Sequence, residues 1–307
     1  LSVVVVNCRS IKNKVADFHH MILKTEADII IGTESWLSDE IHDGEVFPKS
    51  YTIYRKDRIA RTGGGVFIAV TDNISSRAEI FPDSDLESVW CSIKCSAKRF
   101  FICAYYRPPD SSLYSVLELD SQIRRFTSQN NCNNVLIGGD FNVPSIDWGT
   151  YCFKSGGKDK ELCDTLLNTF YSHSLIQLVS TPTRGNNILD LLATNIPECV
   201  VKVETVAGIS DHKAVHGKFH IVPDRKSKSK RKIYSFHKAD FERLKLNLAT
   251  SFAKFKADTC NLGANYAWNF FINIARKAVD ETIPSKLKCT NVEPRWYNAN
   301  VRRSLKR

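Results

Sequence analysis

The sequence lacks any run of consecutive apolar residues that approaches the roughly 20 needed to cross a bilayer as a helix, so no membrane span is expected. None of its 10 cysteines forms a C-x-x-C pair, and their spacing gives no support to a disulfide framework. No positively charged stretch precedes the apolar start, which argues against a secretory signal. We therefore expect a reducing, intracellular compartment with free thiols. An initiator Met is also missing, so we expect a piece of a longer open reading frame.

Positive charge is in excess, and it is concentrated at one end of the chain. The net charge of the 307 residues is +10. Residues 224–307 hold 20 of the 43 Lys and Arg residues but 7 of the 33 Asp and Glu residues, which gives them a net charge of +13 and leaves −3 for residues 1–223. A basic segment beside a near-neutral body indicates a polyanionic partner, although a solvated linker has the same composition.

Residues 1–223 alternate between strand-like and helix-like patterns, which predicts an α/β domain. A continuous β-branched run such as Leu1–Val6 is typical of a strand covered on both faces. Further strands are predicted at Ala27–Ile31, Val66–Val70, Val89–Ile93, Phe100–Tyr106, Val135–Ile137, Ile188–Ala193 and Ala214–Ile221. Helices are predicted over residues 11–25, 113–128 and 159–172 from apolar spacing.

The pattern changes after Pro223. Arg225–Lys232 (RKSKSKRK) is a charge run without apolar periodicity, which predicts a linker. Residues 238–255 and 264–282 have helical spacing, and Trp296–Arg307 is predicted to be a short basic helix. We therefore treat residues 224–307 as a basic linker and helical extension.

Polar residues with metal-binding or proton-transfer chemistry stand beside the ends of the predicted strands or, in one case, within a strand. Those beside strand ends are Asn7, Glu34, Asp140, Asn142, Asp211 and His212, and Asp190 lies within the late strand. Strand ends bring distant segments together around one cleft, where ligands bind in sheet proteins. Carboxylate and amide oxygens suit Mg²⁺ or Mn²⁺ rather than zinc. The set contains what phosphodiester hydrolysis needs: metal ligands, a group that holds the attacking water, and donors to phosphate oxygens.

These residues also carry a resemblance to a known family. The ordered set Asn7, Glu34, Gly138-Gly139-Asp140-Phe141-Asn142, Asp190 and Ser210-Asp211-His212 resembles the motifs of the exonuclease–endonuclease–phosphatase superfamily from residue 1 to about 222. Asn7-Cys8-Arg9-Ser10, Tyr106-Arg107-Pro108-Pro109 and Thr181-Pro182-Thr183-Arg184 are similar to jockey-like endonucleases of non-LTR (LINE) retrotransposons. Pro294–Tyr297 resembles the linker of those proteins toward a reverse transcriptase. A single motif occurs by chance, but the whole set in order over one domain is specific.

The resemblance implies a DNase I-like fold, which is a four-layered α/β sandwich of two sheets. It implies a Mg²⁺-dependent (or Mn²⁺-dependent) endonuclease that nicks DNA, acts in the nucleus and leaves a 3′-hydroxyl. The reverse transcriptase of the parent polyprotein and the element RNA would be further partners. Residues 224–307 would then lead toward that reverse transcriptase.

The resemblance also implies roles for individual residues. Glu34 would be the principal metal ligand, with Asn7 beside it and Asp211 near the metal. Asp140 would orient or deprotonate the attacking water, and Asn142 would contact the scissile phosphate.

Other residues would contact the substrate or position a group that does. Tyr106 would donate to a phosphate oxygen. Asp190 would fix the tautomer of His212, whose other nitrogen would face the phosphate. Arg9, Arg107 and Thr183 would be further substrate contacts.

Two other functions are consistent with the same resemblance, and two residues differ from those that relatives often have. The other functions are a phosphatase of the same superfamily and a catalytically silent nucleic-acid-binding fragment. Ile188 stands where relatives often have Arg, so a contact made by that Arg is not expected here. Pro109 stands where apurinic endonucleases often have Asn, which argues against abasic-site repair.

His212, His216 and His220 recur every four residues and would lie together on a helix. The residues between them alternate apolar with polar instead, which predicts a strand with His216 and His220 on its surface.

Overall fold

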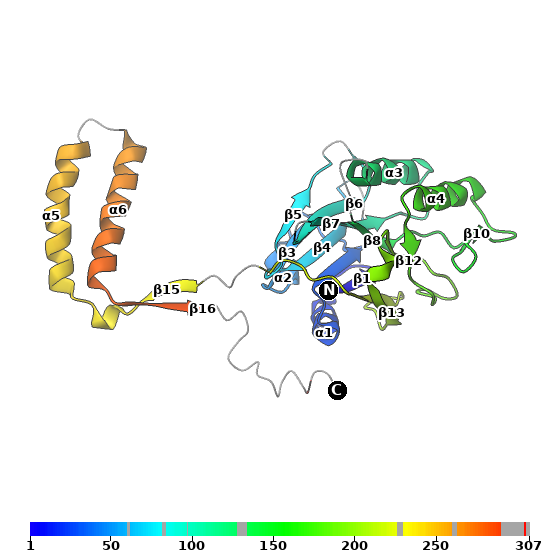
Figure 1. The fold of residues 1–307 in the computed structure, drawn as a ribbon, viewed down its shortest axis with the longest axis horizontal. Coiled ribbons are helices and arrows are strands. Elements are labelled where there is room, and N and C mark those ends of the chain that lie inside the picture. The colour runs from blue at the N-terminus through cyan, green and yellow to red at the C-terminus, as the bar shows by residue number, and fades with distance from the viewer. Residues whose placement is uncertain are drawn as a thin grey trace. The chain divides into compact units, whose positions relative to one another are not determined.

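The structure is a computed structural model that describes residues 1–59, 62–81, 84–96, 98–127, 134–225, 230–259 and 263–289 together with residue 304. The chain divides into two compact units, a first unit that includes Leu1–Lys226 and a second unit, Ser227–Asn291 (Figure 1). The first unit contains every residue predicted to take part in chemistry.

Two six-stranded sheets form the centre of the first unit. The first sheet has the order β13 (Val200–Val206), β14 (Ala214–Phe219), β1 (Ser2–Asn7), β2 (Ile29–Thr33), β4 (Val66–Thr71), β3 (Tyr51–Lys56). The second sheet has the order β11 (Ile176–Gln177), β12 (Asp190–Thr194), β8 (Asn134–Asp140), β7 (Lys98–Tyr106), β6 (Ser88–Cys95), β5 (Ser76–Glu79). The pairs β1–β2 and β7–β8 run parallel, and the other paired strands of these sheets run antiparallel.

Helices cover the outer face of each sheet, as Figure 1 shows, with α1 (Val15–Thr25) on one side and α3 (Tyr114–Thr127) and α4 (Lys160–Ser172) on the other. Between the sheets, Val5 and Ile31 belong to the same buried cluster as Ile102 and Leu136. Separate apolar clusters join the first sheet to α1 and the second sheet to α3 and α4. The predicted four-layered α/β sandwich is therefore confirmed.

Several shorter elements complete the first unit. They are the helix α2 (Asp43–Val46), the strands β9 (Ile146–Asp147) and β10 (Cys152–Phe153), and the 3₁₀ turn Pro197–Cys199. Most predicted strands and helices occur within a few residues of their expected positions, but β3, β5 and β13 were not predicted. Their side chains are mostly half-buried or exposed because β3, β5 and β13 lie at sheet edges, so polar and charged residues interrupt the apolar pattern.

His216 corrects one expectation about the last strand. The alternation over β14 is present, but His216 is 7% exposed rather than on the surface. It pairs in register with Val4, whose face of the sheet is packed under α1, and its Nε2 lies 3.0 Å from Ser2 Oγ. The prediction was wrong because α1 covers the polar face of this strand.

The second unit is a helical hairpin joined to a two-stranded sheet. Helices α5 (Phe241–Thr259) and α6 (Ala264–Thr282) occur where helical spacing predicted them. Strands β15 (Lys230–Tyr234) and β16 (Ser285–Cys289) pair antiparallel, so the end of the charge run predicted as a linker is a strand. Lys232 and Tyr234 of this strand both contact Asp280 of α6, and these contacts hold the strand in place. The predicted helix Trp296–Arg307 and the segment Pro294–Tyr297 lie outside the described residues, Ser304 excepted.

Among the helices that the structure describes, none is long and apolar enough to cross a membrane.

The ends of the central strands converge at one edge of the sandwich. On the second sheet, Tyr106, Asp140 and Asp190 are direct cross-strand partners on β7, β8 and β12. Directly opposed residues project from the same face of a sheet, so these three side chains lie side by side. On the first sheet, Asn7 ends β1 beside Thr33, and Glu34 follows immediately. The register of both sheets thus gathers the motif residues in one place.

Gly139 is required at the end of β8. Its φ is +140°, and a Cβ added there would lie 1.9 Å from the carbonyl oxygen of Tyr105 on the adjacent strand. We expect Gly139→Ala to lower the free energy of unfolding by at least about 2 kcal/mol, because the strand pairing must shift to admit a methyl group. Urea denaturation of the purified protein measures this change.

Gly44→Ala is the matched control, since a Cβ at Gly44 would meet nothing within 4 Å. An equal midpoint for Gly139→Ala and Gly44→Ala would contradict the argument from close strand approach.

Candidate active site

Asn7 connects the two sheets at the convergent edge. Its side chain is 1% exposed, and its Nδ2 donates to Glu34 Oε1 at 3.0 Å and to Asp140 Oδ2 at 2.8 Å. Its Oδ1 accepts from the backbone N–H of Arg9 at 3.1 Å. One buried amide thus holds the carboxylates of Glu34 and Asp140 close to each other.

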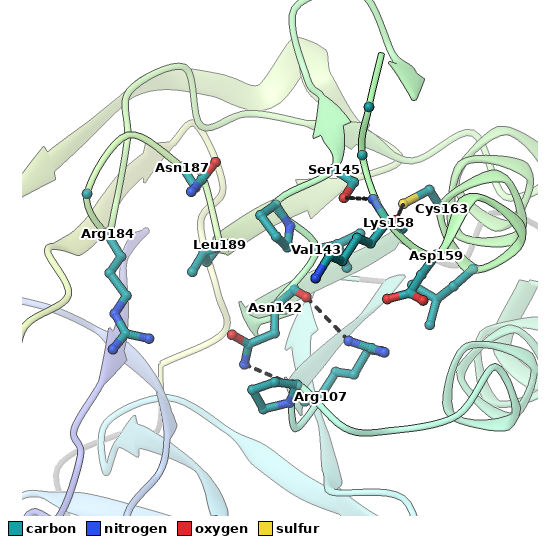
Figure 2. A pocket seen from close by; sticks show the side chains of 16 residues that line it. Arg107, Asn142, Val143, Ser145, Lys158, Asp159, Cys163, Arg184, Asn187 and Leu189 are labelled. Carbon is teal, nitrogen blue, oxygen red and sulfur yellow. Dashed lines mark hydrogen bonds between the residues drawn. The ribbon is translucent and has the colours of Figure 1, made fainter. Parts of the chain in front are cut away.

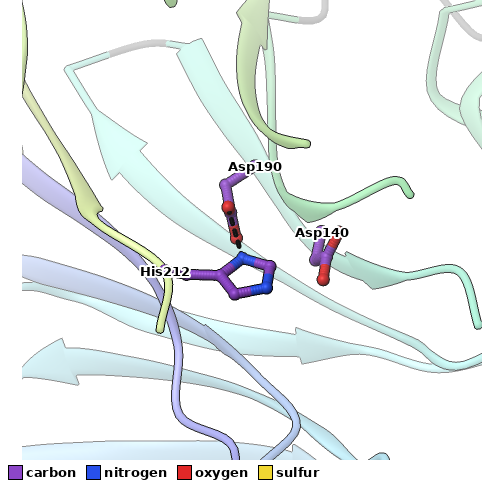
Figure 3. A group of neighbouring side chains, drawn as sticks. All are labelled: Asp140, Asp190 and His212. Atoms are coloured by element: carbon purple, nitrogen blue, oxygen red, sulfur yellow. Dashed lines mark hydrogen bonds and ion pairs between the residues drawn. The ribbon is translucent and has the colours of Figure 1, made fainter. Parts of the chain in front are cut away.

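Asp190 and His212 form a second contact in the same place. Asp190 Oδ2 accepts from His212 Nδ1 at 2.7 Å, and the two residues are 0% and 4% exposed. Because a carboxylate accepts only from a protonated nitrogen, Nδ1 carries a proton. Figure 3 shows the other ring nitrogen, Nε2, turned toward the side on which Asp140 lies. The ring is therefore oriented with one nitrogen available to a ligand beside Asp140.

The electrostatics of this cluster favour proton transfer near neutral pH. Burial, together with the charge of Asp190, raises the pKa of Asp140 to about 8, against the opposing effects of His212, Asn7 and Asn142. Burial acts to lower the pKa of His212, but the hydrogen bond and charge of Asp190 outweigh it and raise that pKa. A base is most effective when its pKa lies close to the working pH, so Asp140 is suited to accept a proton.

The donor set fits a divalent cation. The ligand atoms of Asp140, Asp190 and His212 all lie within 4.8 Å of one another. Asp190 Oδ1 is buried and has no hydrogen-bond partner among the described residues, and Glu34 is only half-buried. The ligands are mainly carboxylate and amide oxygens, which suit hard cations, and a cation would relieve the repulsion between the carboxylates. Either the pair Glu34 and Asn7 or the cluster around Asp140 can contribute ligands.

Left-handed backbone conformations concentrate in the loops of this site. Arg9, Ser10, Glu34, Trp36 and Asn142 have φ values of 41°, 69°, 49°, 53° and 49°. Such conformations cost energy in residues other than glycine and persist where neighbouring structure holds them. The turn Gly63-Gly64-Gly65 does so for the loop after β2, since its carbonyls accept from Ser35 N at 3.2 Å and Trp36 N at 2.9 Å. This support for Glu34 was not predicted from the sequence.

Tyr106 and Asn142 border Asp140 on its own sheet. Burial and the charges of Glu34 and Asp140 raise the pKa of Tyr106, so its phenol keeps its proton and remains a donor. The backbone N–H of Asn142 donates to Asp140 Oδ1 at 3.1 Å, and its Nδ2 donates to the carbonyl of Arg107 at 2.9 Å. The loop after β8 thus folds back onto the carboxylate that precedes it.

Arg107 and Thr183, both expected to contact substrate, are buried supports in this structure. The Arg107 guanidinium is bound to the carbonyls of Asn142 at 3.3 Å and Ser111 at 2.7 Å, and the residue is 3% exposed. Thr183 is 1% exposed, and its Oγ1 accepts from the backbone N–H groups of Leu189 and Asp190 at 3.0 and 3.1 Å. Their described contacts position Asn142 and Asp190.

Asp211 lies at the rim, where its Oδ2 contacts two arginines. Arg9 Nη1 is 3.1 Å away and Arg184 Nη2 is 2.7 Å away. Partial burial acts to raise the pKa of Asp211, but the hydrogen bond from Arg9 and the charges of both arginines outweigh it and lower that pKa. The side chain expected near the metal is therefore ionised and paired with cations.

A cavity of about 630 Å³ opens beside Asn142. Its lining includes Arg107, Asn142, Lys158, Arg184, Asn187 and Leu189, which Figure 2 shows around the opening. Sequence reasoning did not single out Lys158 or this cavity, because neither belongs to a motif that could be read along the chain.

Arg58 and Glu87 were also missed, and they lie behind Tyr106. They form an ion pair, the Arg58 guanidinium lies 5.7 Å from the centre of the Tyr106 ring, and Glu87 Oε2 accepts from Gly65 N at 2.7 Å. These two loop residues therefore connect Tyr106 to the glycine turn that supports Glu34. No pattern in the sequence indicates that pairing.

The chain is similar to known proteins in sequence and in fold. Residues 100–216 match a family model described as endonuclease-reverse transcriptase. The endonuclease domain of TRAS1, a telomere-specific non-LTR retrotransposon, is similar with 18% identity over 71% of this chain and 97% of its own, at a TM-score of 0.54. The AP endonuclease LMAP from Leishmania major is similar with 13% identity over 70% and 86%, at a TM-score of 0.57. The Xenopus laevis APE2 catalytic domain is similar with 14% identity over 74% and 94%, at a TM-score of 0.57. No curated protein matches the chain.

The solved structures share the fold of the first unit, and the family match covers β8, β11, β12 and most of β7 in its second sheet, together with the segments that carry Asp140, Asp190 and His212. The expected resemblance to the endonuclease/exonuclease/phosphatase superfamily, and within it to non-LTR retrotransposon endonucleases, is confirmed.

Proposed function

From that resemblance, we propose that this protein is a Mg²⁺-dependent (or Mn²⁺-dependent) endonuclease that hydrolyses a phosphodiester to nick target DNA, as in non-LTR retrotransposition. One observation carries the proposal. Asn7 joins Glu34 to Asp140, and the Asp190–His212 pair lies against the same carboxylate. This arrangement supplies metal ligands, a base and a hydrogen-bond donor to phosphate at a single site.

The residues divide the hydrolysis between them. Asp140 accepts a proton from the attacking water as its oxygen bonds to phosphorus. The bond from phosphorus to the 3′ oxygen breaks, that oxygen takes a proton from solvent, Asp140 returns its proton to solvent, and the products are a 5′-phosphate and a 3′-hydroxyl. In its doubly protonated form His212 donates through Nε2 to a non-bridging phosphate oxygen, and the Tyr106 phenol donates to another. A divalent cation held by Glu34 and Asn7 would supply neutralisation of phosphate charge.

Charge outside the cluster supports DNA as the substrate rather than a small phosphoester. Arg9 and Arg184 lie at the rim with side chains 55% and 45% exposed. Residues 224–307 add a net charge of +13, so DNA binding should weaken steeply with salt as neutralised phosphates release counterions. We further propose that this segment leads toward a reverse transcriptase, that element RNA is a partner, and that the protein acts in the nucleus.

Nicking of supercoiled plasmid tests the proposed function. With Mg²⁺ we expect open circles, because one strand is cut, and with EDTA we expect cleavage to fall to background. Addition of excess Mg²⁺ should restore nicking. Gel electrophoresis separates the supercoiled and open forms.

Two outcomes would overturn the proposal. Turnover of small phosphomonoesters by protein that leaves plasmid intact would indicate a phosphatase of the same superfamily. Metal-independent DNA binding by folded protein without any cleavage would indicate a silent nucleic-acid-binding fragment.

A further inference from the structure

Asp211 is the centre of an ion-pair bridge at the rim of the site. Its Oδ2 contacts Arg9 Nη1 at 3.1 Å and Arg184 Nη2 at 2.7 Å, and the three side chains are 37%, 55% and 45% exposed. A guanidinium group has five N–H donors. Each arginine therefore retains donors that face solvent while one side is held by the shared carboxylate.

The bridge is joined directly to the catalytic cluster. The backbone N–H of Arg9 donates to Asn7 Oδ1, and Asp211 immediately precedes His212. Arg184 lines the cavity beside Asn142, and Figure 2 shows its guanidinium on the side of the opening away from Lys158. The two guanidinium groups thus come from loops of different sheets, after β1 and before β12, and meet at Asp211, the residue before His212.

Asp211 is poorly placed to bind a cation. Two guanidinium groups on one carboxylate leave a local excess of positive charge, which repels a further cation. Glu34 differs, since its hydrogen bond comes from the neutral amide of Asn7. Among the described residues, the group whose ligand atoms converge comprises Asp140, Asp190 and His212 and does not include Asp211.

We propose that Asp211 is a positioning residue that holds Arg9 and Arg184 as a clamp on the phosphate backbone of the cleaved DNA strand, and that it does not bind the metal. The inference rests on the proposed function, because it assigns the substrate contacts of the same site. Arginine matches phosphate geometry with paired N–H donors, and the carboxylate of Asp211 orients both guanidinium groups before DNA binds.

Asp211→Asn separates a clamp from a metal ligand, because it keeps the shape of the side chain and removes the charge that holds both arginines. For a clamp, we expect KM for a duplex oligonucleotide to rise about 10-fold, kcat to change by less than about 3-fold, and the Mg²⁺ concentration for half-maximal rate to stay unchanged. A metal ligand would instead give a raised Mg²⁺ requirement and a lower kcat at saturating DNA.

Arg9→Ala and Arg184→Ala test the contacts themselves. Each should raise KM and should lower the slope of log affinity against log salt by about 1, because one phosphate contact is lost. Arg77→Ala is the matched control, since Arg77 is also an exposed, paired arginine but lies on the edge strand β5. It should leave KM, kcat and the salt slope unchanged.

Three results would overturn the clamp: a raised Mg²⁺ requirement in Asp211→Asn, a wild-type KM and salt slope in both arginine variants, or equal effects in Arg77→Ala. Binding of a fluorescein-labelled duplex in EDTA measures the salt slope without cleavage. If wild-type protein binds DNA with the expected slopes but never cuts, the proposed function fails and the clamp stands. If it cuts and the Asp211→Asn protein needs more Mg²⁺, the clamp fails and the proposed function stands.

Discussion

Asp140→Asn should lower kcat for plasmid nicking by about 10²- to 10⁴-fold, the range that a positioned general base contributes. An amide has nearly the same shape as the carboxylate and still accepts the hydrogen bond from Asn7, but it cannot take a proton from water. DNA binding should persist, because Asp140 is buried whereas Arg9 and Arg184 are partly exposed. Single-turnover rates at saturating DNA measure the chemical step directly.

The same substitution should not destabilise the fold. Asp140 is a buried carboxylate whose charge is opposed by Asp190, so removal of one charge relieves repulsion. An unchanged or higher midpoint of urea denaturation would exclude unfolding as the cause of inactivity. Asp164→Asn, an exposed position on α4, is the matched control and should retain full activity. A kcat of wild-type size for Asp140→Asn would show that another group accepts the proton.

Asp190→Asn should lower kcat by about 10²- to 10³-fold with little change in KM, because it disturbs the proton of the neighbouring imidazole. The Asp190 carboxylate accepts from His212 Nδ1, and its hydrogen bond and charge raise the pKa of His212 against the effect of burial. An amide at position 190 has no charge, so the pKa of His212 would fall and less of the protein would carry the doubly protonated ring. The phosphate would then lose the charged donor that this ring provides through Nε2.

A double-substitution cycle decides whether Asp190 acts through His212. If it does, Asp190→Asn should add no further loss in a His212→Ala background, since residues that act as a unit are not additive. Fully additive losses would show that Asp190 contributes on its own, for instance as a metal ligand through Oδ1, which has no hydrogen-bond partner among the described residues. Rates are compared at saturating Mg²⁺ and DNA.

The fold and the centre of the candidate site were accessible from the sequence because both depend on local patterns. Buried strands such as β1 and β8 are continuous apolar runs, and the polar residue that ends each run marks the edge where the strands meet. Asn7, Asp140 and His212 are brought together in this way. The edge strand β13 was missed although it contains four valines, because Lys202 and Glu204 interrupt its apolar run.

The directions of individual side chains could not be predicted. Arg107 and Thr183 have residue types that suit a phosphate, yet backbone groups bind Nη1 and Nη2 of Arg107 and Oγ1 of Thr183, and both residues are buried. Contacts between loops could not be predicted from the sequence either. Arg58 reaches Glu87 across 29 positions, and Arg9 reaches Asp211 across more than 200. Such pairs depend on how loops close in three dimensions, which periodicity does not encode.

The cross-strand alignment of Tyr106, Asp140 and Asp190 makes catalytic competence a property of the whole second sheet. These residues come from three strands, and a slip of one residue at either junction would turn a side chain to the opposite face. The strands are separated by long stretches of chain, so the alignment forms only after distant segments have paired. A partly folded intermediate without the β8–β12 pairing would therefore be inert. An endonuclease of the proposed kind would be unable to cut DNA before these distant strands have paired.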